Sequence, residues 1–434
     1  MKRESKKKQQ ISEKPEPGDI VQVDFVKNTY HGTLLESSEP GILLLKLDSG
    51  YNLGFKKKEA LEIRILKRFK EEKEKSEIKQ QSEKPNIAMI ITGGTIASTL
   101  DPRTGGVHPL TSPEELFRFY PELFEKVNVI KVEIPFMKAS EDMDFKDWQK
   151  IARTAGKLLN DPKIKGIIIT HGTDTLHYTS SALSFFLKNL NKPVVLTYSQ
   201  RSIDRASSDA NLNLRCAAIA ALSDIAEVML VGHATTNDSY CFAMSGTKVR
   251  KMHSSERDAF KTINTKPIAK IWPDRIDMAD KFKQRNNKTK VKLDTMFEPK
   301  VALVKFYPGQ DPGILDYYLK KKYHGIVVEA TGLGHVSVEG RNSWLKKIKQ
   351  LHDKGVVICF AAQTIYGRLD PWVYSNAREL LKAGVIYLED MLAETAFVKL
   401  GWVLGHKEWA KNKEKVKETM LTNLVGELNN RLTE

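Results

Sequence analysis

Two stretches of sequence decide the fold of this chain: IAMIITGGTIA at residues 87–97 and GIIITHGTDT at residues 166–175. In each, an apolar run typical of a buried parallel strand ends in a turn that contains glycine and threonine. Ligands of open α/β sheets bind at the carboxyl ends of the strands, where both turns are predicted to lie. The two turns therefore indicate nucleophilic chemistry by a hydroxyl group on a small polar substrate, with no metal or nucleotide required.

Beyond residue 85, apolar runs continue to alternate with helical patterns, which favours an α/β fold with mostly parallel sheets. A helix is predicted to begin at Ser112, with Pro113 in its first turn and Glu115 completing a capping box. The segment 280–292 is dominated by Lys, Arg, Asn and Gln, and we interpret it as the connection between two α/β domains. The runs that predict strands are 87–92, 129–134, 166–170, 193–198, 227–231, 301–306, 325–330 and 356–360, and those that predict helices include 179–190 and 211–222.

The first 85 residues have a different character. Residues 1–16 are charged and polar, and we expect them to be disordered. Residues 17–66 contain short apolar runs punctuated by Gly, Pro and Asp, with a hairpin turn at 48–50. They predict a small β-barrel that resembles an SH3-like module. Residues 67–84 are almost wholly Lys, Glu, Gln and Ser, which indicates a solvated linker or an exposed helix.

Composition narrows the class of protein. A chain of 434 residues is long enough for two or three domains. Lys plus Arg exceed Asp plus Glu by 15. This excess of positive charge favours a polyanionic partner such as nucleic acid. A basic surface rich in Lys and Glu, as in heat-adapted proteins, explains the charge equally well. The three cysteines have no metal-site spacing and fit a reducing cytosol. The lysine-rich start is unlike a secretory signal and no run is long enough to span a membrane, so we expect a cytoplasmic protein.

The two turns contain the groups that such chemistry needs. The turn Gly93-Gly94-Thr95 can expose a hydroxyl beside backbone amides that stabilise an oxyanion, and an ordinary glycine turn is the alternative. It is not a P-loop, because no Gly-Lys-Ser/Thr follows. Thr173-Asp174 adds a second hydroxyl beside a carboxylate. A threonine hydroxyl needs a base, and a partly desolvated lysine can serve; the residues alone leave open whether Lys248 or Lys251 does so, or whether both are surface charges.

A third polar segment, Ser140-Glu141-Asp142, follows the predicted strand 129–134 and a short loop. A serine in this place can hold a substrate carboxylate. An isolated triplet of this kind also serves as an ordinary helix cap, so the residues alone leave both interpretations open.

The two threonine turns, the first after residue 91 and the second after residue 170, resemble in sequence and order the two signatures of the L-asparaginase/glutaminase family. The resemblance covers the chain from about residue 86 to its end. It implies an asparaginase-like α/β body that hydrolyses an amide through a threonine acyl-enzyme, without a metal or other cofactor on this chain. Glu141 stands where the family has the glutamine that holds the substrate α-ammonium group. The implied roles are nucleophile for Thr95, supporting triad for Thr173, Asp174 and Lys251, and substrate binding for Gly94, Ser140 and Glu141.

Three features depart from a plain asparaginase. The stretch between Ser98 and Ser112 lacks the lid tyrosine of the family, and an N-terminal β module is added. His335 stands where many asparaginases have a Gly-Asn cluster that completes a neighbouring subunit's site. The segments 200–205 and 252–260 resemble those of one subgroup, the D subunits of archaeal-type glutamyl-tRNA(Gln) amidotransferases. That subgroup carries such a module before an asparaginase-like body.

The resemblance to this subgroup implies a chain that releases ammonia from glutamine or asparagine inside a complex. The implied partner is an E-type kinase and transferase subunit that uses ATP and Mg²⁺ to convert Glu-tRNA(Gln) to Gln-tRNA(Gln), since no ATP-binding motif occurs in this chain. A homodimer within a two-plus-two heterotetramer, in the cytoplasm and away from membranes, is the implied assembly. Two alternatives stay open: a free-standing cytoplasmic L-asparaginase, and an RNA-binding scaffold with an inactive amidase body.

The sequence thus predicts six segments. They are a disordered tail at 1–16, a small β-barrel module at 17–66, a charged linker at 67–85, an asparaginase-like N-terminal α/β domain at 86–278 that carries the catalytic threonines, a connection at 279–297, and a smaller C-terminal α/β domain at 298–434.

Overall fold

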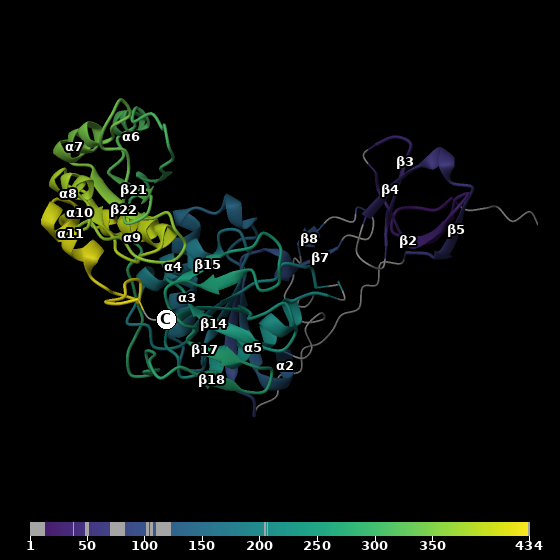
Figure 1. Ribbon diagram of the computed structural model, residues 1–434. Coiled ribbons are helices and arrows are strands. Elements are labelled where there is room, and N and C mark those ends of the chain that lie inside the picture. The colour runs from purple at the N-terminus through teal and green to yellow at the C-terminus, as the bar shows by residue number, and fades with distance from the viewer. Residues whose placement is uncertain are drawn as a thin grey trace, which may run out of the picture.

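The computed structural model, shown in Figure 1, describes residues 14–37, 39–47, 52–69, 83–100, 104, 107–109, 123–203, 205 and 207–432. Nearly all of the predicted tail, most of the charged linker, the hairpin turn at 48–50, most of the stretch between Ser98 and Ser112, and the predicted helix start at Ser112 lie outside the described residues. In Figure 1 the N-terminal sheet (purple) lies apart from a body in which a larger and a smaller α/β unit pack together.

The N-terminal module is a five-stranded antiparallel sheet in the order β4-β3-β2-β1-β5. Alternate residues of the strands face a small apolar core formed by Val21, Val23, Leu34, Leu43 and Leu45. The predicted β-barrel is corrected in one respect: among the described residues β4 and β5 do not pair, so the hydrogen-bond ladder stays open at both edges. The strands are β1 (Ile20–Asp24), β2 (Thr29–Leu35), β3 (Ile42–Lys46), β4 (Asn52–Lys56) and β5 (Glu62–Lys67).

The larger unit of the body is built on an eight-stranded sheet in the order β18-β17-β14-β13-β12-β10-β6-β9. The five strands from β13 to β9 are parallel, and the other three continue the sheet in antiparallel pairing. The carboxyl ends of β6, β10, β12 and β13 therefore lie along one edge. The bounds are β6 (Asn86–Ile91), β9 (Asn128–Glu133), β10 (Ile167–Thr170), β12 (Val194–Thr197), β13 (Val228–His233), β14 (Cys241–Ser245), β17 (Ala269–Ile271) and β18 (Ile276–Met278).

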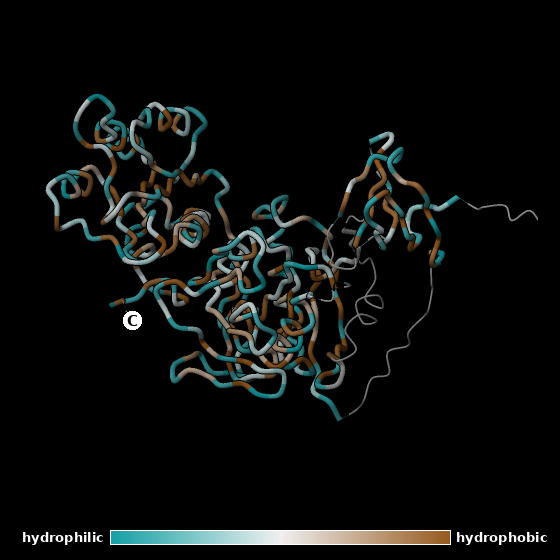
Figure 2. Tube along the Cα trace, turned by 45° about the vertical axis from the view of Figure 1, so that its right-hand side comes forward, coloured by the Kyte–Doolittle hydropathy of each residue, from teal (hydrophilic) through white to brown (hydrophobic). Residues whose placement is uncertain are grey.

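Helices cover both faces of this sheet because its central strands are apolar on both sides. In β6, Ala88 and Ile90 face the core that contains α3 and α4, whereas Ile87, Met89 and Ile91 face the core that contains α5. An Asp144–Asp147 capping box begins α3. Figure 2 shows hydrophobic stretches along the inside of the body and hydrophilic ones in many outer loops. The helices are α2 (Leu123–Lys126), α3 (Phe145–Leu159), α4 (Leu176–Phe186) and α5 (Ala210–Leu222).

Three short antiparallel pairs lie outside the large sheet. The pair formed by β15 and β16 places Lys251 at the end of a hairpin, which becomes important for the site. The pairs are β7 (Ser98–Leu100) with β8 (Val107–Pro109), β11 (Leu187–Lys188) with β19 (Lys292–Leu293), and β15 (Val249–Lys251) with β16 (Phe260–Thr262).

The smaller unit has a four-stranded parallel sheet in the order β20-β21-β22-β23. Helices α6, α7 and α8 share one apolar core with this sheet, and α9 packs between its other face and the larger unit, where it contacts α4. The elements are β20 (Val301–Lys305), β21 (Gly325–Ala330), β22 (Val357–Ala362), β23 (Ile386–Tyr387), α6 (Ile314–Lys320), α7 (Leu345–Asp353), α8 (Ser375–Lys382), α9 (Ala393–Gly405), α10 (Lys407–Ala410) and α11 (Lys413–Leu421).

Candidate active site

The two threonine turns lie directly against each other at the carboxyl edge of the large sheet. Thr92 follows β6, and its hydroxyl donates to the carbonyl of Thr170 at the end of β10 over 2.8 Å. Gly94 has a φ of +85°, and a Cβ added to it would stand 2.5 Å from the backbone nitrogen of Gly172. Only glycine fits at position 94, because both the positive φ and the backbone contact exclude a side chain.

Thr95 is the first residue of a short 3₁₀ helix, η2 (Thr95–Ala97), which begins immediately after this contact. Its side chain is partly exposed, whereas Ile96 and Ala97 are buried and anchor the turn in the core. The hydroxyl of Ser98 donates to the carbonyl of Gly94 over 2.9 Å and closes the turn. Among the described residues, no side chain or backbone group is hydrogen-bonded to the Thr95 hydroxyl, so this hydroxyl is available to a ligand.

A pocket of about 340 Å³ opens between the two turns. The segment that follows β9 provides its third side. A volume of this size accommodates a small polar molecule such as an amino acid amide. The pocket is lined by Gly93, Gly94, Thr95, Ser98, Met137, Lys138, Ala139, Ser140, Glu141, Gly172, Thr173 and Asp174.

Lys251 reaches this pocket from the β15–β16 hairpin. Its ammonium group donates to Thr173 Oγ1 over 2.8 Å and to Asp174 Oδ1 over 2.8 Å. The Lys251 side chain is 11% exposed, whereas Asp174 is 63% exposed and faces solvent on one side. A lysine, a hydroxyl and a carboxylate thus form one hydrogen-bonded group beside the Thr95 turn.

The structure also decides between the two lysines that the residues alone left open. Lys248 is buried and donates to Asp390 Oδ2 over 2.6 Å and to the Asp390 carbonyl over 2.9 Å, in the smaller unit. Three residues later the chain has crossed to the other end of β15, where Lys251 faces Thr173. Of the two, Lys251 is therefore the one placed to act on the pocket.

Ser140 and Glu141 occur where the sequence predicts them, in the short 3₁₀ helix η3 (Ser140–Asp142) at the edge of the pocket. The hydroxyl of Thr175 donates to the Ser140 carbonyl over 2.6 Å and ties this helix to the second turn. Ser140 is buried against Gly172, where a Cβ would approach the Ser140 hydroxyl to 2.9 Å, and Glu141 is exposed. All six predicted pocket residues and Lys251 thus lie together.

Two buried histidines, His171 and His177, lie close to the second turn in the chain. The Nε2 atom of His171 lies 2.9 Å from the Thr179 hydroxyl, and burial lowers the pKa of this ring to about 4. His177 lies in α4 near Arg250 and Lys251; burial, followed by these two cations, lowers its pKa to about 3. Both rings are therefore neutral at pH 7, so neither competes as a cation with Lys251 for Asp174.

The residues just before Ser140 were not anticipated. Lys138 lines the pocket, and its ammonium group pairs with Asp147 at the start of α3 over 2.9 Å. A Cβ on Gly93, whose φ is +118°, would stand 2.4 Å from the Lys138 carbonyl. The sequence could have indicated Lys138, because it lies only two residues before Ser140, which was already a candidate.

His335 is not in this pocket: it lies in the smaller unit after β21, where its ring packs edge-on against Tyr374.

Comparisons with family models agree with the three structural units. A model described as "GatD N-terminal domain" matches residues 15–66, one described as "Asparaginase, N-terminal" matches 86–284, and one described as "Glutaminase/Asparaginase C-terminal domain" matches 300–420. Among the described residues, no helix combines the length and the apolar character needed to cross a membrane.

Solved structures share the fold of the body. The thermostable L-asparaginase from Thermococcus kodakarensis aligns with a TM-score of 0.70 and 30% identity, over 80% of this chain and 100% of that protein. L-asparaginase I from Vibrio cholerae aligns with a TM-score of 0.65 and 28% identity, over 80% of this chain and 99% of that protein. The predicted asparaginase-like two-domain α/β body is thereby confirmed.

Curated relatives match almost the whole chain, including the N-terminal module. The D subunit of the glutamyl-tRNA(Gln) amidotransferase of Pyrococcus furiosus is 47% identical over 424 residues, which is 95% of each chain. The corresponding D subunit of Methanothermobacter thermautotrophicus is 40% identical over 420 residues, with 95% of this chain and 94% of the relative covered. The chain therefore belongs to the family of D subunits of glutamyl-tRNA(Gln) amidotransferases.

Proposed function

We propose that this chain is the ammonia-releasing subunit of a tRNA-dependent amidotransferase. It hydrolyses the side-chain amide of glutamine, or of asparagine, and a partner uses the ammonia to convert Glu-tRNA(Gln) to Gln-tRNA(Gln). The observation that carries this proposal is the Lys251–Thr173–Asp174 hydrogen-bonded group beside the Thr95 hydroxyl. Membership of the family supports the reaction, and the geometry supports the choice of residues.

The chemistry follows from the positions of these groups. Thr95 Oγ1 attacks the amide carbon of the substrate, and its proton passes to Thr173 Oγ1 as Thr173 gives its own proton to Lys251, whose side chain acts in this step as the neutral amine. Backbone amides around Gly93 and Gly94 stabilise the negative oxygen of the tetrahedral intermediate. Breaking the carbon–nitrogen bond releases ammonia, which carries away the transferred proton. Water then hydrolyses the threonine ester, releases the carboxylic acid and regenerates the hydroxyl.

Substrate binding is assigned to the third side of the pocket. We propose that Ser140 holds the substrate carboxylate, and that Glu141 and Asp174, both exposed carboxylates, hold the α-ammonium group. Gly94 brings the backbone close to the substrate. Because Glu141 replaces an amide with a charged group, it attracts an ammonium ion more strongly than a glutamine does.

The remaining steps are assigned to the partner. We propose an E-type subunit that binds ATP and Mg²⁺, phosphorylates the γ-carboxyl group of Glu-tRNA(Gln) and receives the ammonia; no cofactor is assigned to this chain. Two copies of each subunit would form the complex through a homodimer of this chain. The three buried free cysteines suit a cytoplasmic location.

A free-standing L-asparaginase is less favoured because the amidotransferase relatives match the N-terminal module as well as the body. An inactive scaffold is less favoured because Thr95, Thr173, Asp174 and Lys251 are all present and assembled.

The test is ammonia release by the complex with Thr95→Ala. Removal of the nucleophile should lower kcat by about a thousandfold or more, while Thr154→Ala, which removes an exposed hydroxyl on α3, should leave it unchanged. Mass spectrometry of the rapidly quenched wild-type enzyme should find the acyl group on the peptide that contains Thr95. Undiminished Gln-tRNA(Gln) formation with glutamine as donor in Thr95→Ala would contradict the assignment.

A further inference from the structure

The catalytic lysine is the last residue of β15 before the loop of a hairpin, and this loop is fastened to a different part of the sheet edge. Lys251 ends β15, and residues 252–259 lead to β16. The Lys251–Asp174 pair is open to water on one side, because Asp174 is 63% exposed, and such a pair contributes only modestly to holding the lysine in place. Further contacts of the hairpin therefore help to keep the ammonium group on Thr173.

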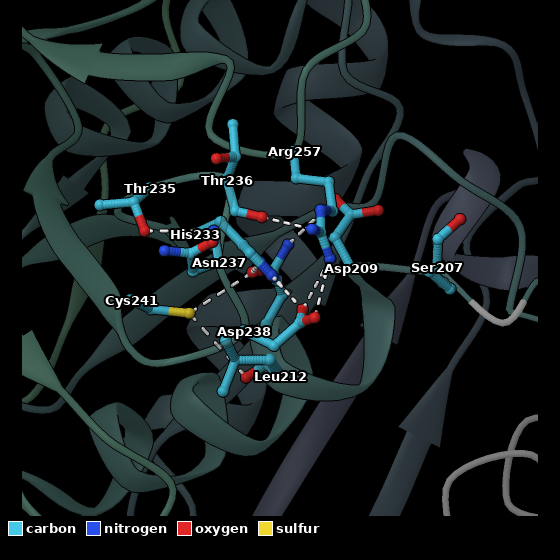
Figure 3. A network of polar contacts seen from close by, with 12 residues as sticks. Ser207, Asp209, Leu212, His233, Thr235, Thr236, Asn237, Asp238, Cys241 and Arg257 are labelled. Atoms are coloured by element: carbon cyan, nitrogen blue, oxygen red, sulfur yellow. Dashed lines mark hydrogen bonds and ion pairs between the residues drawn. The ribbon is translucent and has the colours of Figure 1, made fainter.

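Arg257, at the tip of this hairpin, provides such a restraint. Its Nη1 donates to both oxygens of Asp238 over 2.9 Å, and Nη2 donates to the carbonyl of Thr236 (Figure 3). The Arg257 carbonyl accepts from the hydroxyl of buried Tyr198 over 3.0 Å. The guanidinium group of Arg257 is thus bound to the loop that follows β13, and its carbonyl group is bound to the residue that follows β12.

Asp238 is in turn held from inside the protein. The ring of His233, the last residue of β13, is fully buried, with Nε2 at 2.9 Å from Asp238 Oδ1 and Nδ1 at 2.6 Å from Asn213 Oδ1. Asn213 lies in α5 and also donates to the Tyr198 carbonyl over 2.9 Å. Asp238 is itself 61% exposed, but two side chains, Arg257 and buried His233, converge on it, so this contact is less isolated than the Lys251–Asp174 pair.

The network continues to the other loop at this edge. Asp209, buried at the start of α5, accepts the backbone N–H groups of Gln200 and Arg201 over 2.9–3.1 Å, and Asn213 Nδ2 lies 3.4 Å from its Oδ2. Burial raises the pKa of Asp209. Residues 200–201 and the loop 252–259, distant in sequence, are therefore joined through a chain of polar side chains that is buried except at its Asp238–Arg257 end.

We infer that Arg257, with Asp238 and His233, forms a clamp that positions Lys251 against Thr173 and Asp174. The inference rests on the proposed function, since it assigns positioning residues to that reaction. The three residues do not touch the pocket, so they act only through the hairpin. Loosening the clamp should impair proton transfer and leave the binding of substrate by Ser140 and Glu141 intact.

The test uses the complex with Asp238→Asn and Arg257→Met. Each change should lower kcat for ammonia release about tenfold with little change in KM, because a small displacement of a catalytic group is costly. Labelling of Lys251 by an amine-reactive reagent, followed by peptide mass spectrometry, should become several-fold faster as the ammonium group leaves its partners. Arg257→Lys should restore part of the activity, since it keeps the charge but not the planar fork.

Asp353→Asn is the matched control, because Asp353 is also an exposed, ion-paired aspartate, on α7 far from the hairpin. It should change neither kcat nor Lys251 labelling. Unchanged kcat in both clamp variants, or a lower kcat without faster Lys251 labelling, would overturn the inference. If the wild-type complex releases no ammonia, the proposed function fails, while the labelling of Lys251 still shows whether the clamp holds it.

Discussion

At the scale of single residues, the site depends on the contact between Gly94 and Gly172. We predict that Gly94→Ala abolishes ammonia release, because the new methyl group meets backbone atoms 2.5–2.6 Å away and must displace the Thr95 turn. The cost in stability should be about 2 kcal/mol or more, from the positive φ and the steric overlap together. Urea denaturation and initial rates of ammonia release measure the two effects.

Gly309 offers the control for this change. Its φ is +81°, close to that of Gly94, but nothing lies within 4 Å of an added Cβ. Gly309→Ala should therefore cost only the conformational strain, about 1 kcal/mol, and leave activity unchanged. Equal activity of the two alanine variants would show that the contact between the turns is not needed.

Much of the candidate site could be predicted at this scale. Thr95, Thr173 and Asp174 stand in turns directly after apolar strands, and the order of strands in a parallel sheet brings such turns together. The lysine could not be chosen from the residues alone, because Lys248 and Lys251 lie three residues apart in the same short stretch. Which one reaches the pocket depends on Asp390, which is 142 residues from Lys248 and binds it in the folded chain.

At the scale of elements, the ends of the apolar strands of the body were predicted to within about two residues, because a glycine or proline marks the boundary of several of them. The structure places β21 at Gly325–Ala330, as predicted, and β6 one residue earlier than predicted at each end. β5 gives no clear strand signal in the sequence, because Glu, Arg and Lys flank its apolar residues at an exposed sheet edge. The antiparallel strands β17 and β18 have three residues each, too few to show a period.

The unit formed by β10 and α4 buries two neutral histidines, which makes stability depend on pH. The pKa values of His171 and His177 are about 4 and about 3 in the folded protein, against 6.5 for a free side chain. Between pH 6.5 and 4, only the unfolded chain takes up these protons. The free energy of unfolding should therefore fall on acidification by about 1.4 kcal/mol per pH unit for each histidine.

Urea denaturation at pH 7, 6 and 5 measures this slope. His177→Gln removes one of the two groups and should make the loss of stability between pH 6 and 5 smaller by one histidine's share. The same slope in the variant and the wild type would mean that His177 is protonated in the folded state.

At the scale of the whole molecule, the two α/β units are joined by a common core and a buried ion pair. Helix α9 packs on α4, and Lys248 of the larger unit binds Asp390 of the smaller one, with both side chains almost fully excluded from solvent. Asp390 also accepts the backbone N–H of Asn429 over 2.9 Å, near the end of the chain. The units should therefore unfold together.

Lys248→Met tests this connection. It leaves Asp390 charged and buried without its lysine, which should cost about 3–5 kcal/mol and lower the melting temperature. Lys349→Met, which breaks the exposed Lys349–Asp353 pair of α7, should cost less than about 1 kcal/mol. Calorimetry compares the two; similar melting temperatures would show that the buried pair does not hold the units together.

The central claim is that the Thr95 pocket serves a complex rather than acting alone. The most direct measurement is ammonia release from glutamine by the chain by itself, and after stepwise addition of the partner subunit, ATP and Glu-tRNA(Gln). We predict that the complete mixture raises the rate by about tenfold or more, as expected when binding at one site is coupled to another. A rate for the isolated chain that none of the three additions changes would contradict the account and identify a free-standing amidase.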